Sequence, residues 1–259
     1  MTASQFKDHF SGHSATYQNA RPSYPASMYK WLRAQIPHAG PIRAWDCATG
    51  NGQVARDLIQ HADHVVATDA SPQQIECALP QVNIDYRVAS AEQSGLEPES
   101  VHWITVGQAL HWFDTARFYE EASRVLVPGG LLSMWTYRQV HITRAVDELI
   151  GELYEDVLGP YWPVERFWVE QGYKGLLPAW QSLATPQFET ACDWTAEQLA
   201  AYLSSWSATQ RYRRQTGEDP VAKMFDALRE RYGAGQRRVR WALVLHAFRR
   251  PSPASLATL

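Results

Sequence analysis

The sequence predicts an α/β fold of the Rossmann-like, doubly wound type, in which a parallel sheet is covered by helices on both faces. Short apolar runs at 42–46, 65–69, 84–88, 101–106 and 131–137 alternate with stretches of helical periodicity. A glycine-rich loop follows the first run, and an acidic residue ends the second. Sheets that bind nucleotides combine these features at the carboxyl ends of neighbouring strands.

The first apolar run leads into the most informative segment, AWDCATGNGQ at 44–53. The run ends in Asp46 and turns at Gly50 and Gly52, two residues that permit positive φ and a close backbone approach. Apolar residues then recur at helical spacing, so we expect a helix to begin after the loop and to present free N–H groups to a ligand. The second run ends in Asp69, a carboxylate that can accept from both hydroxyls of a ribose.

Two cofactor classes fit this outline. The residues from Gly50 to Ala55 also satisfy the G-x-G-x-x-G/A fingerprint of dinucleotide binding, which would indicate a nicotinamide-dependent oxidoreductase. Asp46 argues against it, because a carboxylate before the loop repels a pyrophosphate but can accept from the ammonium group of an amino acid. The pattern favours S-adenosylmethionine, while a turn former or helix cap is an alternative role for Asp46.

Three further segments carry a family resemblance: YRVASAE at 86–92, GQALHWFD at 107–114 and RVLVPGG at 124–130. Together with the glycine loop, they make the chain similar to the class I S-adenosylmethionine-dependent methyltransferases, in the subset called methyltransferase type 11. GQALHWFD resembles the trans-aconitate methyltransferase-like branch, whose members act on small molecules. Segments at 17–25 and 202–208 resemble the same branch.

The resemblance implies a mostly parallel seven-stranded sheet with an antiparallel edge, completed by strands near 188–194 and 239–248. It implies one methyltransferase domain over the whole chain. We expect four parts within it: an N-terminal lid at 1–38, a cofactor-binding half at 39–139, an inserted helical cap at 140–186, and C-terminal strands and helices at 187–259.

The resemblance also assigns a cofactor site. Asp46 and the Gly50 backbone would hold the methionine end, Asp69 the ribose, Ser90 the adenine edge, and Gln108 would border the sulfonium. The full set expected to contact the cofactor is Tyr17, Arg21, Asp46, Ala48, Gly50, Gly52, Asp69, Ala70, Ser90, Ala91, Glu92 and Gln108. Ala48 replaces the first glycine of the family's D-x-G-x-G-x-G pattern, and we expect it to preserve the loop with a negative φ.

The acceptor is expected to meet His111, Trp112, Tyr137 and Trp206, with His111 and Trp112 in catalytic positions. Methyl transfer from a sulfonium needs alignment more than a nucleophilic side chain. A carboxylate acceptor is already ionised and needs no base, whereas a hydroxyl acceptor would use His111, whose ordinary pKa lies near neutrality. Core packing is the alternative role for this aromatic pair.

Composition limits the other functional classes. The 259 residues are 45% apolar, which suits a well-buried core, and 24 Lys plus Arg face 27 Asp plus Glu, a balance that argues against nucleic-acid binding. The 3 cysteines are isolated and no metal-ligand spacing appears, so we expect a reducing, cytoplasmic setting without a metal. No apolar stretch is long enough to cross a bilayer, so no membrane partner is expected. A non-catalytic cofactor-fold partner protein is the remaining alternative to an enzyme.

Overall fold

The computed structural model describes residues 23–251, and its core is an eight-stranded sheet in the order β3-β2-β1-β4-β5-β8-β6, with β7 also paired to β8. The strands are β1 (Arg43–Cys47), β2 (His64–Asp69), β3 (Ile84–Val88), β4 (Val101–Gly107), β5 (Leu126–Tyr137), β6 (Gln181–Ser182), β7 (Phe188–Trp194) and β8 (Arg237–Arg249). Strands β1 to β5 are parallel, whereas β6 and β7 both pair antiparallel with β8, which itself runs antiparallel to β5.

The predicted mostly parallel sheet with an antiparallel edge is confirmed, and the short β6 is added to the seven expected strands. The central strand β1 is buried along four of its five residues, because both faces of the sheet are covered. Side chains alternate between the faces, so that Ala44 belongs to one core and its neighbour Trp45 to the other. The parallel strands therefore read as nearly continuous apolar runs.

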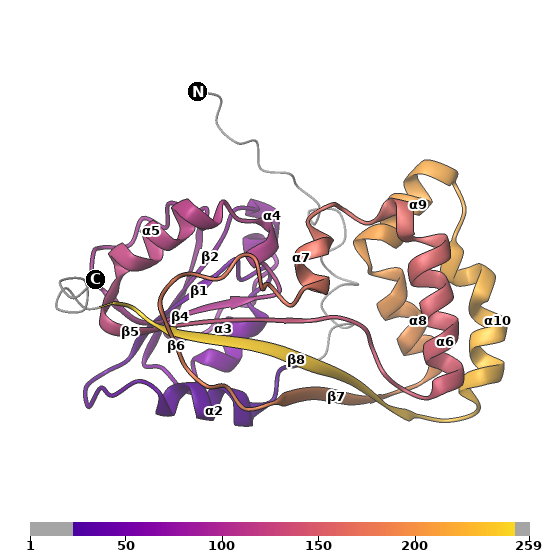
Figure 1. Cartoon of the computed structure of the whole chain (residues 1–259), viewed down its shortest axis with the longest axis horizontal. Coiled ribbons are helices and arrows are strands. Elements are labelled where there is room, and N and C mark those ends of the chain that lie inside the picture. Colours follow the sequence, from indigo (N-terminus) through magenta and orange to yellow (C-terminus); the bar gives the residue numbers. More distant parts are fainter. Residues whose placement is uncertain (1–22, 252–259) are drawn as a thin grey trace.

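Helices cover both faces of the sheet (Figure 1). On one face, α2 (Ala26–Ala34) and α3 (Gln53–Leu58) pack Met28 and Leu58 into the larger core. On the other face, α5 (Thr115–Val125) contributes Phe118 to the second core. The short α4 (Pro72–Glu76) and the 3₁₀ turn η1 (Leu110–Trp112) connect strands at the edge where β2 and β4 end.

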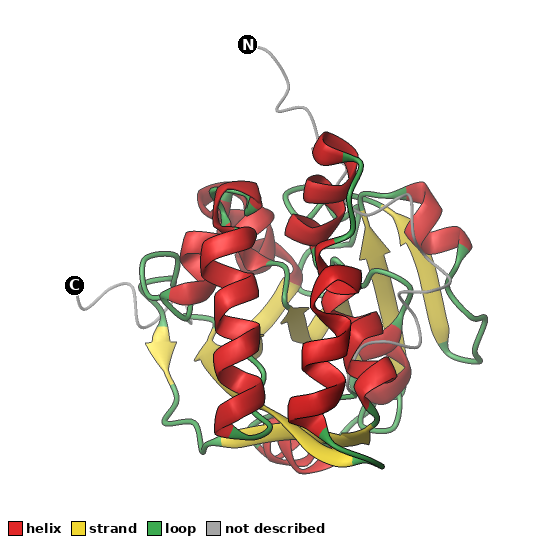
Figure 2. Ribbon diagram, turned by 90° about the vertical axis from the view of Figure 1, so that its right-hand side faces the viewer, coloured by secondary structure: helices red, strands yellow, loops and turns green. Residues whose placement is uncertain are grey.

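A helical cap stands beside the sheet, as Figure 2 shows from its own side. It consists of α6 (Arg144–Glu152), the π-helical turn η2 (Leu153–Val157), the 3₁₀ turn η3 (Gly159–Tyr161), α8 (Ala196–Ser204), α9 (Ser207–Thr216) and α10 (Pro220–Tyr232). Helix α10 packs against both α6 and α8. The cap therefore combines the expected insertion at 140–186 with helices from the 187–259 part of the chain.

Polar residues at the start of the cap helices explain where these begin. The Thr195 side chain accepts from the Gln198 backbone and the Gln198 side chain accepts from the Thr195 backbone, which forms a capping box. Asp219 caps α10 by accepting from two backbone amides of its first turn. Between sheet and cap lies α7 (Arg166–Glu170), which packs against η1.

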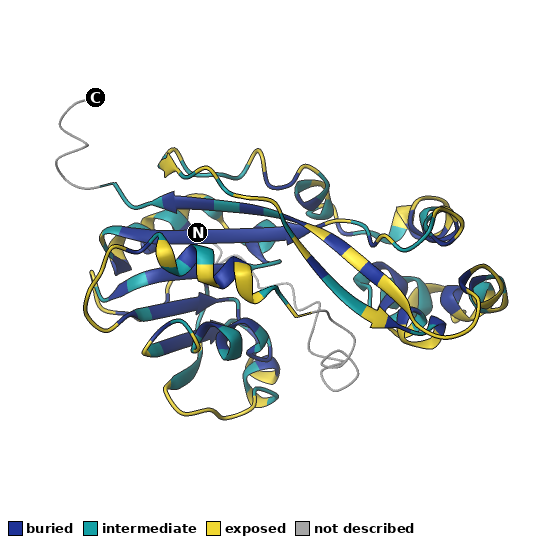
Figure 3. Cartoon of the chain, turned by 90° about the horizontal axis from the view of Figure 1, so that it is seen from below, coloured by how far each residue is buried: buried dark blue, intermediate teal, exposed yellow. Residues whose placement is uncertain are grey.

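One long strand joins the two parts. The second half of β8 pairs with β5 and its first half pairs with β7, and Leu243 lies opposite Tyr137 on one side and Phe188 on the other. Residues of β8 alternate between buried and exposed over most of its length, as Figure 3 shows. Among the described residues, no helix is long and apolar enough to span a membrane.

Candidate functional site

The carboxyl ends of the parallel strands meet at one edge of the sheet and bring most of the expected cofactor residues together. Asp46 lies near the end of β1, Asp69 ends β2, and Gln108 directly follows β4. Register places Asp46 opposite Ala67 of β2 and Thr105 of β4. The sheet therefore gathers residues that are more than 60 positions apart in the sequence at one edge, as the topology predicts.

Asp46 lies beneath the glycine loop rather than on its surface. Its carboxyl is almost fully buried and accepts from the Thr49 hydroxyl at 2.5 Å and the Thr105 hydroxyl at 2.8 Å. The pKa of Asp46 is raised to about 7, because burial outweighs the two hydroxyl bonds, which lower it, and the nearby charge of Asp69 adds a smaller increase. One carboxyl oxygen thus holds the loop through Thr49, and the other bonds β4 through Thr105. A structural role is the alternative considered for this residue, and contact with the cofactor stays a prediction.

The loop itself is built from residues with positive φ, and the expectation for Ala48 is wrong. Ala48 adopts φ +56°, Gly50 +57° and Gly52 +82°. The loop keeps the left-handed geometry that a glycine would supply at the first position, so the alanine costs about 1 to 2 kcal/mol of backbone strain. The Ala48 side chain packs at the margin of the second core.

The two glycines of the loop differ in what surrounds them. A Cβ on Gly52 would lie 2.4 Å from the Tyr86 hydroxyl, so this position needs glycine for close packing against β3. Within residues 23–251, a Cβ on Gly50 would meet only the Gln74 side-chain oxygen, at 3.7 Å. The described residues therefore do not crowd the backbone of Gly50 at the carboxyl edge, where a ligand is expected to approach.

Asp69 organises the neighbouring turn. One carboxylate oxygen accepts from the Gly50 backbone amide at 2.9 Å, and the other accepts from the Ser71 amide, also at 2.9 Å. Both oxygens of the Asp69 carboxylate thus hold backbone amides of neighbouring turns, and contact with a ribose stays a prediction. Ala70, the next residue, is partly buried, and its contact with the cofactor also stays a prediction.

The segment expected to border adenine lies beside Asp69. The Ala89 amide donates to the Asp69 carbonyl at 3.0 Å, and Ser90 forms a bridge with Gln93 in a tight turn. Ala91 is buried, whereas the Glu92 carboxylate accepts from the Asp114 backbone amide at 3.0 Å. This hydrogen bond from Asp114 connects the turn to the start of α5, a role that was not predicted for Glu92.

Gln108 is fixed more firmly than the sequence indicated. It adopts φ +57°, its amide nitrogen donates to the Tyr137 carbonyl at 3.1 Å, and its amide oxygen accepts from the Thr136 hydroxyl. The backbone of Gln108 also donates to the Trp135 carbonyl. These bonds orient the side chain across the gap between the ends of β4 and β5.

His111 has a partner that sequence reasoning missed. Its Nδ1 atom lies 3.1 Å from the hydroxyl of Tyr173, with the two rings stacked, and the Trp112 ring centroid lies 4.6 Å from the His111 ring centroid. Tyr173 is fully buried, and this burial raises the pKa of its hydroxyl, which stays protonated at neutral pH. When Nδ1–H donates to the Tyr173 oxygen, Nε2 is the unprotonated nitrogen that a general base requires.

The other two expected acceptor residues lie farther into the cap side of the core. Tyr137 is buried and packs against Trp241, with ring centroids 6.3 Å apart. The Trp206 ring packs edge-on against the Tyr154 ring inside the cap, with ring centroids 5.6 Å apart. Its centroid also lies 5.6 Å from that of Trp162. Tyr137 and Trp206 therefore do not contact His111 or Trp112 directly in the described part of the chain, and their acceptor contacts stay predictions.

Tyr17 and Arg21, which are also expected to contact the cofactor, lie outside the described residues.

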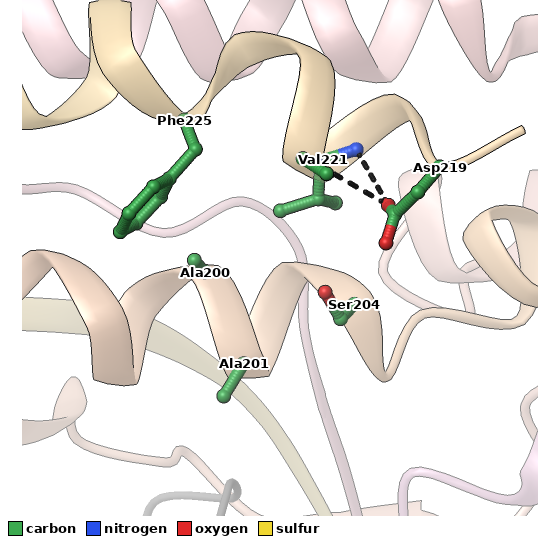
Figure 4. Close-up of a pocket in the computed structure, with 7 residues that line it drawn as sticks. Ala200, Ala201, Ser204, Asp219, Val221 and Phe225 are labelled. Carbon is green, nitrogen blue, oxygen red and sulfur yellow. Dashed lines mark hydrogen bonds between the residues drawn. The ribbon is translucent and has the colours of Figure 1, made fainter.

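A surface pocket lies between α8 and α10, as Figure 4 shows, and is lined by Ala200, Ala201, Ser204, Asp219, Val221, Ala222 and Phe225. Asp219 is occupied there as a helix cap and as the partner of Arg213, so this pocket belongs to the cap rather than to the strand edge. Within residues 23–251, no group of metal-ligating side chains gathers.

Comparison with known proteins agrees with this geometry. A family model described as a methyltransferase domain matches residues 45–134. A protein of Dictyostelium discoideum named as a methyltransferase is 30% identical over 234 residues, 89% of each chain. A Mycobacterium tuberculosis protein named as an uncharacterized methyltransferase is 33% identical over 183 residues, 66% of this chain and 69% of the relative.

A solved structure described as a type II methyltransferase, from Anaeromyxobacter dehalogenans, superimposes with a TM-score of 0.83 at 36% identity. It covers 89% of this chain and 98% of its own. The strand order, the loop between β1 and α3, and similarity along nearly the whole chain lead to one conclusion: the chain belongs to the class I S-adenosylmethionine-dependent methyltransferases.

Proposed function

We propose that this methyltransferase moves a methyl group from S-adenosylmethionine to a small-molecule acceptor, and that it does so in a cytoplasmic setting. The observation that supports this most is the double anchoring of Asp69 to the amides of Gly50 and Ser71. It fixes a carboxylate at the strand edge next to Gly50, whose Cβ position is not crowded by any residue within 23–251. That combination fits a ribose beside an amino-acid group.

The residues present fit this cofactor. Asp69 would accept from the ribose hydroxyls, the Gly50 backbone would approach the methionine end, and Asp46 would face the ammonium group through the loop. When bound, the cofactor supplies an electrophilic methyl group on a sulfonium leaving group. The chain then has to hold the acceptor in line and keep water out, a positioning effect that contributes about 7 to 11 kcal/mol in favourable cases.

The role of His111 depends on the acceptor. A carboxylate acceptor arrives ionised, so His111 and Trp112 would only shape its approach. With a hydroxyl acceptor, His111 Nε2 would receive the proton while Tyr173 holds the other ring nitrogen. We propose a carboxylic acid of the kind used in the trans-aconitate methyltransferase-like branch as the first class of acceptor to test.

Two measurements test the proposal. Calorimetric titration with S-adenosylhomocysteine and with NAD should give binding of the first alone; tight binding of NAD would support an oxidoreductase instead. A screen of small carboxylic acids with methyl-labelled cofactor should then transfer label to at least one. Cofactor binding with no transfer to any class of small acceptor would favour the non-catalytic alternative.

A further inference from the structure

Between the sheet and the cap lies a guanidinium that has no role in the proposed function, that of Arg166. Arg166 begins α7, and its side chain is only 20% exposed. The guanidinium carbon lies 4.9 Å from the ring centroid of Trp162 and 5.5 Å from that of Tyr154. Burying a charge to this extent is costly unless the charge is paired, so the position of Arg166 requires an explanation.

Among the described residues, only the Nε atom of the Arg166 guanidinium has hydrogen-bond acceptors. Arg166 Nε donates to the Tyr154 hydroxyl at 2.8 Å and to the Glu170 carboxylate at 3.1 Å. The Tyr154 hydroxyl in turn donates to the same Glu170 oxygen at 2.5 Å. Within residues 23–251, the two terminal nitrogens of Arg166 have no hydrogen-bond partner. Two parallel N–H donors of this kind match the two oxygens of a carboxylate.

An unusual backbone feature holds this arrangement in place. Tyr154 lies in η2, the π-helical turn that follows α6, and Trp162 donates from its indole nitrogen to the Tyr154 carbonyl at 3.1 Å. π-Helical turns are rare and occur frequently at functional sites. Burial raises the pKa of Tyr154 to about 12, so its hydroxyl remains a donor and keeps Glu170 directed at Arg166 Nε.

Arg166 also lies on the side of the cap that faces the methyl-transfer region. Its helix, α7, packs against η1, the turn that carries His111. The positive charge of Arg166 lowers the pKa of Tyr173, in opposition to burial, and Tyr173 is the hydroxyl partner of His111. No hydrogen bond joins Arg166 to His111 or Gln108 in the described part of the chain, so Arg166 does not bond the side chains expected next to the transferred methyl group.

The formal charges around Arg166 indicate which chemical group of a ligand would bind there. Arg138 donates to the Glu170 backbone carbonyl at 3.2 Å, so a second guanidinium contacts the residue whose side chain pairs with Arg166. Arg138, Arg166 and Glu170 together carry a formal charge of one positive unit. A single carboxylate would neutralise that charge, whereas a dianionic phosphate would leave an excess of negative charge in a partly buried site.

We propose that Arg166 is a specificity residue that binds a carboxylate of the acceptor, separate from the atom that receives the methyl group. The acceptor class is then a small bifunctional acid, such as a dicarboxylic or hydroxycarboxylic acid. This inference rests on the proposed function, since it assumes an acceptor beside His111. Tyr154 and Glu170 act as positioning residues that fix the guanidinium.

The test measures binding of acids and their uncharged amides to the protein saturated with S-adenosylhomocysteine. The probes are trans-aconitate, salicylate and glutarate, each with its amide. Wild type should bind at least one acid about tenfold or more tightly than the matching amide. Arg166→Met should remove that difference while leaving the affinity for S-adenosylhomocysteine unchanged. Arg144→Met, which removes an exposed arginine of α6 paired with Glu148, should change neither affinity.

A second variant controls for the case in which Arg166→Met fails to fold. Arg166→Lys keeps a positive charge for Glu170 but has a single terminal nitrogen, so it should fold and still lose most of the preference for acids. Three outcomes overturn the inference: equal binding of acid and amide by wild type, equal losses for both in Arg166→Met, or no binding of any acid by a protein that binds S-adenosylhomocysteine. Absence of S-adenosylhomocysteine binding would instead overturn the proposed function, on which the inference rests.

Discussion

Replacement of Asp46 by asparagine tests how the glycine loop is held. Asp46→Asn keeps the size of the side chain and its ability to bond the hydroxyls of Thr49 and Thr105, but it removes the charge. Burial raises the pKa of this carboxyl to about 7, so its ionised form is unfavourable in the folded protein at neutral pH. Without cofactor, the variant should therefore be more stable than wild type above neutrality, and this difference should shrink as the pH falls toward 3.8.

The magnitude follows from the two pKa values. The ordinary pKa of 3.8 applies to the unfolded chain, so the folded protein binds the extra proton between 3.8 and about 7. Its stability therefore falls as pH rises through this window, and the shift of about three pKa units amounts to about 4 kcal/mol in total. Between about pH 5 and about pH 8, wild type should lose about 2 to 3 kcal/mol relative to Asp46→Asn.

Urea unfolding followed by tryptophan fluorescence at both pH values measures this difference. Comparing the two proteins cancels the titration of other groups, and Asp85→Asn, at a carboxyl paired with Arg87 on the surface, serves as a control. A difference between Asp46→Asn and wild type that does not change with pH would refute the reasoning. If Asp46 also faces the cofactor ammonium, affinity of wild type for S-adenosylhomocysteine should rise with pH through about 7, and that of the variant should not.

Three further substitutions give separate tests. Ala48→Gly should raise the free energy of unfolding by about 1 kcal/mol, because glycine adopts φ +56° without strain; a loss of stability would contradict this. Asp69→Ala should weaken S-adenosylhomocysteine binding by about 2 to 4 kcal/mol in calorimetry, and an unchanged affinity would remove Asp69 from the site. Tyr173→Phe should lower kcat with a hydroxyl acceptor by about tenfold to a hundredfold and shift its pH profile through His111. Tyr119→Phe removes a half-buried hydroxyl that is bonded to a backbone carbonyl, and an equal effect from both variants would indicate general destabilisation.

Much of the sheet was predictable because it depends on local pattern. Apolar runs of strand length, separated by helical periodicity, predicted β1 to β5 within a few residues, and the start of β5 at Leu126 was the main difference. That strand includes Pro128 and Gly129, which indicate a turn locally, yet pairing with β4 shifts register there and continues. The local turn is kept as a bulge between Leu126 and Leu131, with Gly129 at φ +74°, and the strand pairs with β4 on both sides of it.

The site was harder to predict where it depends on contacts between distant segments. Asp46, Asp69 and Gln108 could be predicted to share one edge because each lies at the carboxyl end of a strand in the expected order. Tyr173 lies 62 positions from His111 and in an irregular segment, so no spacing pattern could connect them. The positive φ of Ala48 was also unpredictable from residue type, because only the closure of the loop onto Asp46 and Asp69 demands it.

The shared strand β8 has a consequence for how the molecule unfolds. A slip of one position in its pairing would turn alternate side chains such as Trp241 and Leu245 outward, and it would do so beside β7 and β5 together. Neither partner strand can therefore change register alone at Leu243, where the two pairings meet. The sheet and the cap should accordingly behave as one cooperative unit in native-state hydrogen exchange, with the backbone amides of β5, β7 and β8 opening at the same free energy.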